Sequence, residues 1–496
     1  MRAMPGLPHA LYRPDQVAAL DRYAIERLGV PGMQLMERAG RIAYEALRAA
    51  WPDRRELLVL CGSGNNGGDG YVVADLARLD GLSVDLIQMG DPDALNGDAR
   101  TAAERFLAGG GRRRAFGGDL GVVAPVVVDA LLGTGLQREV RADWAALIDA
   151  VNALGAPVLA VDIPSGLSGE SGAVLGTAIR ADLTTTFIGL KRGLFTGRGP
   201  ALTGEILWSG LDLPEALFRQ QPPSALRTDY LSVCHRLRPR ERDAHKGAHG
   251  HVLILGGDHG MGGAALMSAT GALRTGAGLV SVATRPAHVG AILGARPEVM
   301  ALGIDAAANA SPLLARASVI AVGPGLGRSE WGRGLLGAAA ASGVPLVVDA
   351  DALNLLAEDP RPMPQAVLTP HPGEAARLLG CSTTEVQRDR WGAALELQKR
   401  YQATVILKGA GTIIQAAGEI PRVCSDGNPG LATGGTGDVL TGICAGLLAQ
   451  GHAPLQAAEL AVCLHAAAGD RAAEQGERGM VATDLLAPLR RLVNPS

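Results

Sequence analysis

Aromatic residues are scarce in this chain, making up only 3% of its 496 residues. No apolar run approaches the roughly 20 residues that a membrane-spanning helix needs, and the opening MRAMPGLPHALYRPD lacks the apolar core of a signal peptide. The formal net charge is only −3, so bulk electrostatics attract neither nucleic acid nor an anionic membrane. We therefore expect a protein that binds neither.

Cysteine is also rare, and its placement excludes two further classes. The six cysteines lie far apart with no C-x-x-C pair, which argues against a disulfide framework and against a zinc site. Reduced thiols and a cytoplasmic location are expected. The chain is rich in small apolar residues and contains 68 glycines, which is typical of strands and helices joined by tight turns. Its length suggests two domains.

The first half of the chain alternates apolar strands with helices. A helical segment at 14–50 comes first, and helices are expected at 71–79, 98–108 and 143–154. Strands are expected at 56–62, 83–90, 124–135, 158–166, 182–190 and 204–210. Continuous apolar runs separated by helices indicate a parallel, doubly wound, Rossmann-like α/β sheet.

The second half forms another α/β unit after a change of composition. Residues 213–244 carry prolines and many charges without a sustained period, as expected of a linker. Strands are then expected at 251–257, 278–285, 318–327, 345–354, 366–374 and 404–414, and two apolar helices close the chain. We place the two domains at 1–218 and 228–496.

The stretch NPGLATGGTGDVLTGICAGL (428–447) is the most informative motif. A glycine-rich loop leads into Asp438, and apolar residues at helical spacing follow. A helix that starts at such a loop presents unpaired N–H groups and the positive end of its dipole, so the loop can cradle a phosphate. Asp438 would lie beside that phosphate, where a carboxylate can move a proton. A tight strand-to-helix turn is the simpler alternative.

The first half places polar side chains at several expected strand ends. CGSGNNGGDG (61–70) lacks the G-x-G-x-x-G spacing of a dinucleotide loop, and Asn65, Asn66 and Asp69 offer oxygen ligands instead. Asp129, the segment 133–139, Asp162 and Ser165 follow other strands. Ligands of open α/β sheets bind at this edge. Oxygen ligands without His or Cys favour a hard cation over zinc. Asp129 and Asp162 could instead cap helices.

These motifs resemble a known family. MQLMERAG (33–40), GSGNNGGDG (62–70), DALLGTG (129–135) and VDIPSG (161–166) are similar to the NAD(P)H-hydrate epimerase family, also called the YjeF N-terminal domain, over nearly all of residues 10–215. The resemblance implies interconversion of the R and S forms of hydrated NADH and NADPH, with a bound potassium ion. It implies hydrate contacts by Asn65, Asn66, Gly67, Gly68, Asp69, Gly133, Thr134, Gly135, Leu136, Gln137, Arg138, Glu139 and Asp162. It implies potassium ligands at Asn66, Asp129 and Ser165. Either Asp129 or Asp162 transfers the proton.

Two further motifs stand at strand ends of the second half. In TPHPGE (369–374), proline on both sides of His371 fixes the backbone, so the imidazole and Glu374 can be aimed into a site. Lys408 to Thr412 (KGAGT) follows the strand TVIL and supplies a cation and backbone donors for a nucleotide phosphate.

Together with HKGAHGHVLILGGDHGMGGAALMSATGALRTGAGLV (245–280), VGPGLG (322–327) and NPGLATGGTGD (428–438), these motifs resemble the ADP-dependent NAD(P)H-hydrate dehydratase family over about 240–490. That family is ribokinase-like. The resemblance implies that ADP drives conversion of the S hydrate to NAD(P)H, releasing AMP and phosphate, with magnesium at the phosphates and Asp438 as general base. The implied hydrate contacts are Ala264, Gly325, Gly327, His371 and Asp438. The implied nucleotide contacts are Lys408, Gly409, Ala410, Gly411, Thr412, Gly434, Gly435, Thr436 and Gly437.

Both halves would act on one damaged cofactor, so the whole chain resembles the bifunctional NAD(P)H-hydrate repair enzymes. The expected partners are small molecules, namely the hydrates and ADP, and the protein is expected to be a homo-oligomer. The alternative is a ribokinase-like small-molecule kinase with a non-catalytic N-terminal binding module. That alternative shares GTGD, but it explains neither TPHPGE nor the first domain.

Overall fold

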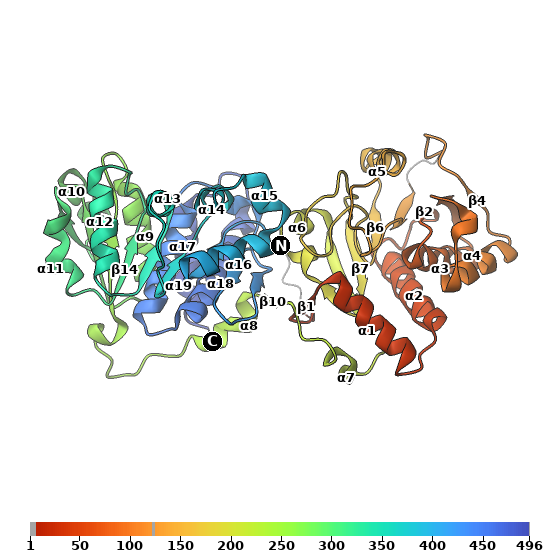
Figure 1. Ribbon diagram of the computed structural model, residues 1–496, viewed down its shortest axis with the longest axis horizontal. Coiled ribbons are helices and arrows are strands. Elements are labelled where there is room, and N and C mark those ends of the chain that lie inside the picture. Colours follow the sequence, from red (N-terminus) through yellow and green to blue (C-terminus); the bar gives the residue numbers. More distant parts are fainter. Residues whose placement is uncertain (1–5, 122–124, 496) are drawn as a thin grey trace. The chain divides into compact units, whose positions relative to one another are not determined.

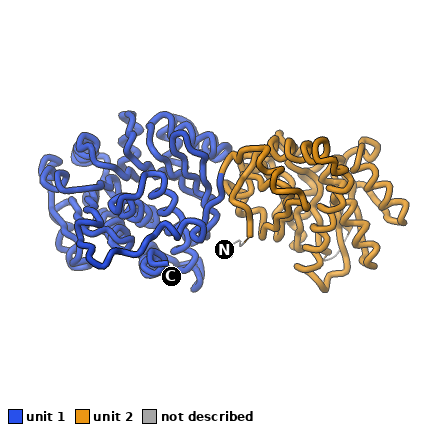
Figure 2. The backbone as a smooth tube through the Cα atoms, turned by 90° about the horizontal axis from the view of Figure 1, so that it is seen from below, with its two compact units in different colours: residues 1–3, 226–496 blue, residues 4–225 orange. Residues whose placement is uncertain are grey.

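The computed structural model describes residues 6–121 and 125–495. Internal contacts divide the chain into two compact units, an N-terminal unit that ends at Ala225 and a C-terminal unit that begins at Leu226 (Figure 2). This division falls in the interval 219–227 between the two expected domains. Residues 1–5 and Ser496, at the ends of those domains, and Ala124, at the start of an expected strand, lie outside the described residues.

The N-terminal unit is built on a seven-stranded sheet with the order β4-β3-β2-β5-β6-β7-β9. All its neighbouring strands are parallel, which confirms the doubly wound sheet. The strands are β2 (Glu56–Cys61), β3 (Ser83–Gln88), β4 (Arg113–Arg114), β5 (Val126–Ala130), β6 (Val158–Val161), β7 (Leu183–Phe187) and β9 (Glu205–Ser209). A separate parallel pair joins β1 (Ala10–Tyr12) and β8 (Leu190–Lys191).

Helices cover both faces of this sheet, because each strand is apolar on both sides (Figure 1). In β2, Leu57 and Val59 pack into one buried cluster, while Leu58 and Leu60 pack into another with residues of α5. The helices are α1 (Pro14–Glu26), α2 (Gly32–Ala50), α3 (Asn65–Leu79), α4 (Gly97–Ala108), α5 (Ala142–Leu154), α6 (Gly199–Leu202) and α7 (Glu215–Phe218). The helical segment expected at 14–50 is therefore two helices.

Helix α3 begins six residues earlier than expected, so the expectation that it starts at residue 71 was wrong. Asn65 to Gly70 form its first turns and not a loop. The glycines belong there because the packing leaves no room for side chains. A Cβ on Gly67 would lie 2.0 Å from the Gly62 carbonyl oxygen, and one on Gly70 would lie 2.6 Å from the Ala130 Cβ. Close packing against neighbouring backbone outweighs the poor helix propensity of glycine.

The C-terminal unit has a larger, mixed sheet with the order β13-β12-β11-β14-β15-β16-β17-β18-β19-β10. Its strands are β10 (Ala225–Thr228), β11 (His251–Leu255), β12 (Leu279–Thr284), β13 (Met300–Gly303), β14 (Val319–Val322), β15 (Leu346–Val348), β16 (Ala366–Leu368), β17 (Thr404–Leu407), β18 (Ile413–Gln415) and β19 (Arg422–Cys424). Pairs β17–β18 and β18–β19 are antiparallel, and the other pairs are parallel.

Several expectations for this unit need correction. The strands expected at 345–354 and 366–374 end at Val348 and Leu368, and helices begin soon afterwards, at Ala350 and Pro372. The run 404–414 is not a single strand, because the KGAGT segment turns the chain between β17 and β18. Part of the expected linker is also ordered in the sheet, since β10 pairs with β19 over residues 226–228. The sequence pattern did not reveal this strand, because it is short and lies among charged residues. Its pairing partner also lies almost 200 residues further on.

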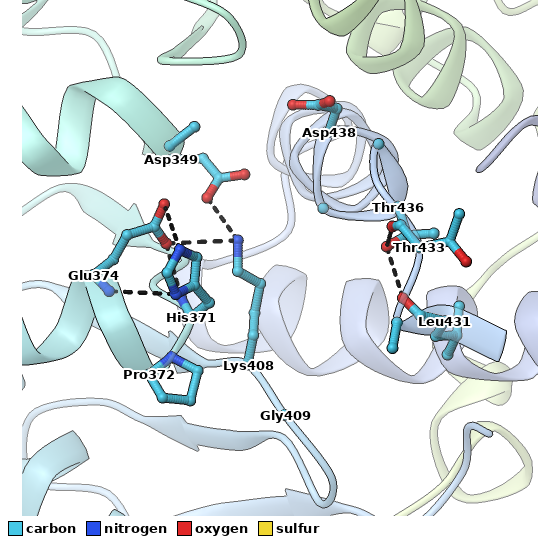
Figure 3. A pocket seen from close by; sticks show the side chains of 14 residues that line it. Asp349, His371, Pro372, Glu374, Lys408, Gly409, Leu431, Thr433, Thr436 and Asp438 are labelled. Atoms are coloured by element: carbon cyan, nitrogen blue, oxygen red, sulfur yellow. Dashed lines mark hydrogen bonds and ion pairs between the residues drawn. The ribbon is translucent and has the colours of Figure 1, made fainter. Parts of the chain in front are cut away.

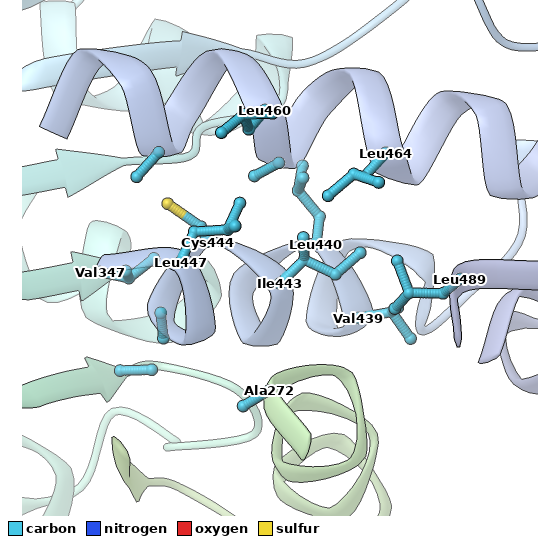
Figure 4. Packing of buried hydrophobic residues seen from close by; sticks show 14 of the residues in the cluster. Ala272, Val347, Val439, Leu440, Ile443, Cys444, Leu447, Leu460, Leu464 and Leu489 are labelled. Carbon is cyan, nitrogen blue, oxygen red and sulfur yellow. The ribbon is translucent and has the colours of Figure 1, made fainter. Parts of the chain in front are cut away.

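A buried helix, α17 (Thr436–Ala449), packs between α9 and α18 in the C-terminal unit (Figure 4). Its residues from Val439 to Leu448 are all buried. The helices of this unit are α8 (Tyr230–Val233), α9 (Gly262–Thr275), α10 (Pro286–Ala295), α11 (Ser311–Leu314), α12 (Glu330–Ala341), α13 (Ala350–Glu358), α14 (Pro372–Leu379), α15 (Thr383–Arg388), α16 (Arg390–Tyr401), α17, α18 (Pro454–Ala472) and α19 (Leu486–Leu492). Among the described residues, none of the helices is both long and apolar enough to cross a membrane.

Candidate active sites

A cavity of about 420 Å³ opens at the carboxyl ends of β15, β16 and β17 in the C-terminal unit (Figure 3). This is the edge at which ligands of open α/β sheets bind, and the volume is suited to a small molecule. The residues that line it are Asp349, Ala350, His371, Pro372, Glu374, Lys408, Gly409, Leu431, Ala432, Thr433, Gly435, Thr436, Gly437 and Asp438.

The start of α17 forms one wall of this cavity. Gly435 caps the helix with φ +91°, a left-handed conformation that favours glycine, and a Cβ there would lie 2.6 Å from the Met267 sulfur. The Thr436 carbonyl accepts a hydrogen bond from Nε2 of the partly buried His465, at 2.9 Å. The start of the helix is thus fixed by a hydrogen bond from α18, and its first residues line the cavity.

Asp438 lies in the first turn of α17, as the sequence predicts. Burial, together with the nearby Asp349 and Asp351, raises the pKa of its carboxyl to about 7, although Lys408 acts in the opposite direction. A carboxylate with a pKa near neutrality can both accept and release a proton at physiological pH.

The HPGE motif forms the opposite wall. His371 caps α14, where its Nδ1 accepts hydrogen bonds from the N–H groups of Gly373 (3.0 Å) and Glu374 (3.3 Å). A Glu374 carboxylate oxygen accepts in turn from the His371 N–H, at 2.8 Å. Burial, together with Lys408 and Arg377, lowers the pKa of His371. Because Nδ1 accepts hydrogen bonds, the proton of the neutral imidazole is on Nε2, which lies 3.4 Å from the Glu374 Oε1 atom.

Lys408 is held by a carboxylate that the sequence analysis missed. Its Nζ donates to Asp349 Oδ1 at 2.8 Å, and Thr441 Oγ1 donates to Asp349 Oδ2 at 2.7 Å. Burial alone would raise the pKa of Asp349, but Lys408 and these hydrogen bonds lower it. Asp349 directly follows the apolar strand β15, the same signal that marked Asp129 and Asp162, so it could have been found.

Glu374 has a different environment from Asp349. Burial and the charge of Asp349 raise its pKa to about 7, although Lys408, 4.0 Å away, acts in the opposite direction. The cavity thus combines one ionised carboxylate, one fixed ammonium group and two carboxyl groups that titrate near neutrality. Such a set of shifted pKa values is typical of catalytic sites.

The structure brings together only part of the predicted hydrate and nucleotide residues. His371, Lys408, Gly409, Gly435, Thr436, Gly437 and Asp438 line the cavity. Of the residues described, Ala264, Gly325, Gly327, Ala410, Gly411, Thr412 and Gly434 are outside its lining. Ala264 and Gly325 are neighbours, since a Cβ on Gly325 would lie 3.3 Å from that of Ala264. The Gly327 N–H donates to Asp351 at 2.9 Å, and Asp351 in turn influences Asp438.

The N-terminal unit places Asp129, Ser165 and Asn66 at one edge of its sheet. Asp129 is fully buried and accepts hydrogen bonds from the Ser165 hydroxyl (2.6 Å), the Ser165 N–H (2.7 Å) and the Leu131 N–H (3.3 Å). Burial raises its pKa to about 6, against these bonds. The side-chain amide of Asn66 is buried, and neither its oxygen nor its nitrogen has a hydrogen-bond partner in the described structure. Gly133 lies against Asn66, since a Cβ on Gly133 would lie 3.3 Å from that of Asn66.

Asp162 is paired with a lysine that the sequence analysis also missed. It directly follows β6 in a left-handed conformation (φ +69°) and contacts the Nζ of the fully buried Lys191. Lys191 also donates to Thr186 Oγ1 at 3.0 Å and to the Phe187 carbonyl at 3.1 Å. Burial, and the charges of Asp162 and Asp21, raise the pKa of Asp69 well above its usual range. Lys191 gives little sequence signal, because its partner lies 29 residues earlier.

The remaining residues of the segment 133–139 are more open. Gly135, Gln137, Arg138 and Glu139 are exposed, whereas Thr134 and Leu136 are partly buried. Asn65 is exposed at the first position of α3, while Gly67 and Gly68 are buried within its first turns.

The fold and the sites together define a Rossmann-like α/β domain joined to a ribokinase-like α/β domain with a glycine-capped helix start at its cavity. Family models agree: residues 32–193 match the YjeF-related protein N-terminus, and residues 252–491 match NAD(P)H-hydrate dehydratase. A ribokinase-like superfamily protein from Enterococcus faecalis superposes with a TM-score of 0.50 at 30% identity, covering 54% of this chain and 94% of its own.

Relatives over the full length identify the family. The bifunctional NAD(P)H-hydrate repair enzyme Nnr of Coxiella burnetii is 49% identical, over 98% of this chain and 99% of its own length. The enzyme of the same name from Escherichia coli is 45% identical, over 99% of this chain and 95% of its own. This chain belongs to the family of bifunctional NAD(P)H-hydrate repair enzymes.

Proposed function

We propose that the chain repairs hydrated nicotinamide cofactors by two activities, one in each unit. The N-terminal unit interconverts the R and S hydrates of NADH and NADPH. The C-terminal unit converts the S hydrate to NAD(P)H at the expense of ADP, giving AMP and phosphate. Full-length membership of the bifunctional family carries this conclusion. It also argues against the alternative of a kinase with a silent N-terminal module, because the family spans both units.

The dehydration chemistry follows from a poor leaving group. Loss of hydroxide from the hydrated ring is slow, whereas transfer of the β-phosphoryl group of ADP to the ring hydroxyl creates a phosphate that leaves readily. The products are then AMP, phosphate and the reduced nicotinamide. Asp438 is the general base that takes the hydroxyl proton, and its pKa of about 7 suits that role.

The charge of the transferring phosphoryl group is stabilised from two sides. The open N–H groups at the start of α17 and the positive end of its dipole face the cavity. The Lys408 ammonium group lies across from them, fixed by Asp349. Fixed donors of this kind stabilise transferred phosphoryl groups without reorganising during the reaction. Asp349 is therefore a positioning residue for Lys408.

Magnesium would bind here with the nucleotide and not in a protein cage. Within the described ranges, no group of three or more His, Cys, Asp and Glu side chains could hold a metal ion. Magnesium commonly uses one or two carboxylates together with substrate phosphates and waters. Glu374, which faces the cavity, fits as such a carboxylate. The ion would supply charge neutralisation at the phosphates.

Potassium fits the edge of the N-terminal sheet. The amide of Asn66 has buried polar atoms without a partner, and it would join the oxygens of Asp129 and Ser165. Three oxygen ligands with a single formal charge are weak for magnesium and better suited to a large monovalent cation. Such an ion would compensate the charge of the buried Asp129 carboxylate and fix the surrounding loops.

Asp162 is the better candidate for proton transfer in epimerisation. Both Asp129 oxygens are already occupied by hydrogen bonds from Ser165 and Leu131, and the carboxyl is fully buried. The Asp162 side chain remains 18% exposed and has Lys191 as its fixed counter-ion. Asp69, with its raised pKa, would be the proton-carrying partner nearby.

One experiment tests both activities. The purified full chain is incubated with mixed R and S hydrates, with and without ADP, and the absorbance of the reduced nicotinamide is followed. With ADP, we expect the whole hydrate pool to be converted. Without ADP, we expect the R and S forms to interconvert with no gain in absorbance. If the R form remains after the S form is consumed, the N-terminal unit is not an epimerase.

A further inference from the structure

Arg390 is a buried arginine behind the segment Lys408–Thr412 that the proposed mechanism does not use. It begins α16 and is only 1% exposed. One terminal nitrogen donates to the Gln387 side chain at 2.9 Å. The other lies within reach of three backbone carbonyls, those of Leu407 (3.2 Å), Lys408 (3.3 Å) and Gly411 (3.4 Å). The guanidinium group therefore ties together the two ends of the turn between β17 and β18.

These contacts do not serve the helix on which Arg390 lies. The start of α16 is capped by Asp389, whose side chain accepts from the Gly392 N–H at 2.9 Å. The carbonyls that Arg390 holds lie 17 to 21 residues further along the chain. A planar guanidinium group presents its donors in fixed directions, whereas the donors of a lysine ammonium group rotate on a flexible chain.

Holding these carbonyls fixes where the neighbouring N–H groups point. In a trans peptide, the C=O and the following N–H point in opposite directions, and no peptide bond of the described chain is cis. With the Lys408 and Gly411 carbonyls turned toward Arg390, the N–H groups of Gly409 and Thr412 point away from it. Gly409 lines the cavity, whereas Arg390 is not among the lining residues.

Gly409 leaves room for this arrangement. A Cβ at this position would lie 2.9 to 3.2 Å from the guanidinium atoms of Arg390, and its φ of +141° is in the region that favours glycine. The guanidinium group and the loop backbone are thus in direct contact, with no side chain between them. Burial lowers the pKa of Arg390 to about 10, so it stays charged at neutral pH.

We propose that Arg390 is a positioning residue for nucleotide binding: it holds the turn Lys408–Thr412 so that the N–H group of Gly409 faces the phosphates of ADP. The proposal rests on the proposed function, in which this turn binds the nucleotide. Arg390 itself contacts neither ADP nor the hydrate.

The test compares Arg390→Met and Arg390→Lys with wild type in the full chain. We expect both variants to raise the KM and the Kd for ADP by about tenfold to a hundredfold, because small misplacements of binding groups cost that much. The KM for the S hydrate should change less than about threefold, and epimerisation should not change. Arg390→Lys keeps the charge and guards against a folding defect in Arg390→Met. We expect Arg390→Lys to restore little of the ADP binding, because an ammonium group cannot reproduce the planar arrangement of the guanidinium donors.

Arg227→Met is the matched control. Arg227 is also buried, and it lies on β10 of the same sheet. Its guanidinium group donates to Asp229 (2.6 Å) and to Ser425 (2.9 Å), and neither of these residues belongs to the turn. It should leave the KM for ADP unchanged, even if it lowers thermal stability. If Arg390 acted only on stability, the Arg390 and Arg227 variants would behave alike in ADP binding, and the proposal would be wrong.

Lys408→Ala separates this inference from the proposed function. Loss of ADP binding in Lys408→Ala, with normal binding in both Arg390 variants, would overturn only the role of Arg390. Normal ADP binding in Lys408→Ala would instead show that the nucleotide does not bind at this turn. Amide hydrogen exchange gives an independent readout: in the Arg390 variants, the peptide covering 408–412 should exchange faster, and ADP should protect it less. Unchanged exchange there would contradict the proposal.

Discussion

Single carboxylates in the two candidate sites differ in what surrounds them, and this difference assigns their roles. Asp349 is neutralised by an ammonium group 2.8 Å away, whereas Asp438 has no such contact within the described residues and is influenced by two other carboxylates. The same residue type therefore orients a lysine in one place and exchanges a proton in another.

We expect Asp438→Asn to reduce dehydration by about 10²- to 10⁴-fold, the usual contribution of a general base. The amide keeps the shape of the side chain, so ADP binding should be nearly unchanged. Steady-state rates and calorimetric ADP titration check this pair of results. If Asp438→Asn keeps more than about a tenth of the wild-type turnover, Asp438 is not the general base. In wild type, the rate should fall as pH drops below about 7, because the base becomes protonated.

Asp129→Ala should abolish epimerisation, while dehydration of pure S hydrate continues unchanged in the other unit. The substitution removes the only formal charge of the proposed potassium site and leaves the Ser165 N–H without its carboxylate acceptor. Rates with pure R and pure S hydrate, measured in potassium and in a bulky organic cation, test it. If the rate of epimerisation is the same with either cation, the proposal that potassium binds at this site is wrong.

At the scale of elements, helix starts carry much of the proposed chemistry. Both α3 and α17 begin with glycines at a strand-to-helix connection, but these glycines have different structural roles. In α3 they allow close packing with neighbouring backbone, and in α17 Gly435 supplies a left-handed cap. The two helices therefore respond differently to the same substitution.

We expect Gly435→Ala to destabilise the C-terminal unit by about 1–2 kcal/mol, the usual cost of a left-handed conformation for a residue with a Cβ. Its Cβ would also meet the Met267 side chain. The free energy of unfolding should be measured by urea titration. The transition of the C-terminal unit is the one that ADP shifts to higher urea concentration. Gly434→Ala is the matched control, since a Cβ there has open space and no positive φ is involved. Equal effects of the two substitutions would contradict the cap argument.

The element order was predictable from sequence because buried parallel strands give continuous apolar runs that helices separate. Every strand pair of the N-terminal sheet is parallel, as expected. What could not be predicted depends on tertiary contacts. The early start of α3 requires knowing that Gly67 packs on Gly62, and β10 requires its partner β19.

The candidate sites show the same limit. The motif residues Asp438, His371 and Lys408 line one cavity, because strand ends and helix starts of a parallel sheet meet at one edge. Asp349 and Lys191 were missed, since each is recognised by a partner distant in sequence. The placement of ADP, hydrate and potassium at these residues stays a prediction.

At the scale of the whole molecule, each unit has its own buried clusters. Residues just before the division are tied to the N-terminal unit, since Gln16 donates to the Pro222 carbonyl and the Ser224 N–H donates to that of Leu11. The residues just after it belong to β10 of the C-terminal sheet.

Separating the chain between Ser224 and Ala225 should therefore give two folded fragments, because no sheet strand is divided. The C-terminal fragment should consume only the S hydrate, and only with ADP. Circular dichroism, thermal melting and hydrate assays on each fragment check this. A C-terminal fragment that begins after Thr228 is the control: it lacks β10 and should melt at a lower temperature. If neither correct fragment folds alone, the units are not independent.

Helix α17 presents Asp438 at one end and, over its remaining length, buried residues such as Ile443 and Leu447 (Figure 4). One rigid element thus joins the reacting end of the site to the interior packing. We expect substitutions at the buried positions to displace the carboxylate that we propose as general base as well as loosen the core. A genetic screen that scores only cofactor repair in cells would therefore confuse these two defects. Within this helix, abundance and turnover per molecule must be measured separately before a variant is assigned to either cause.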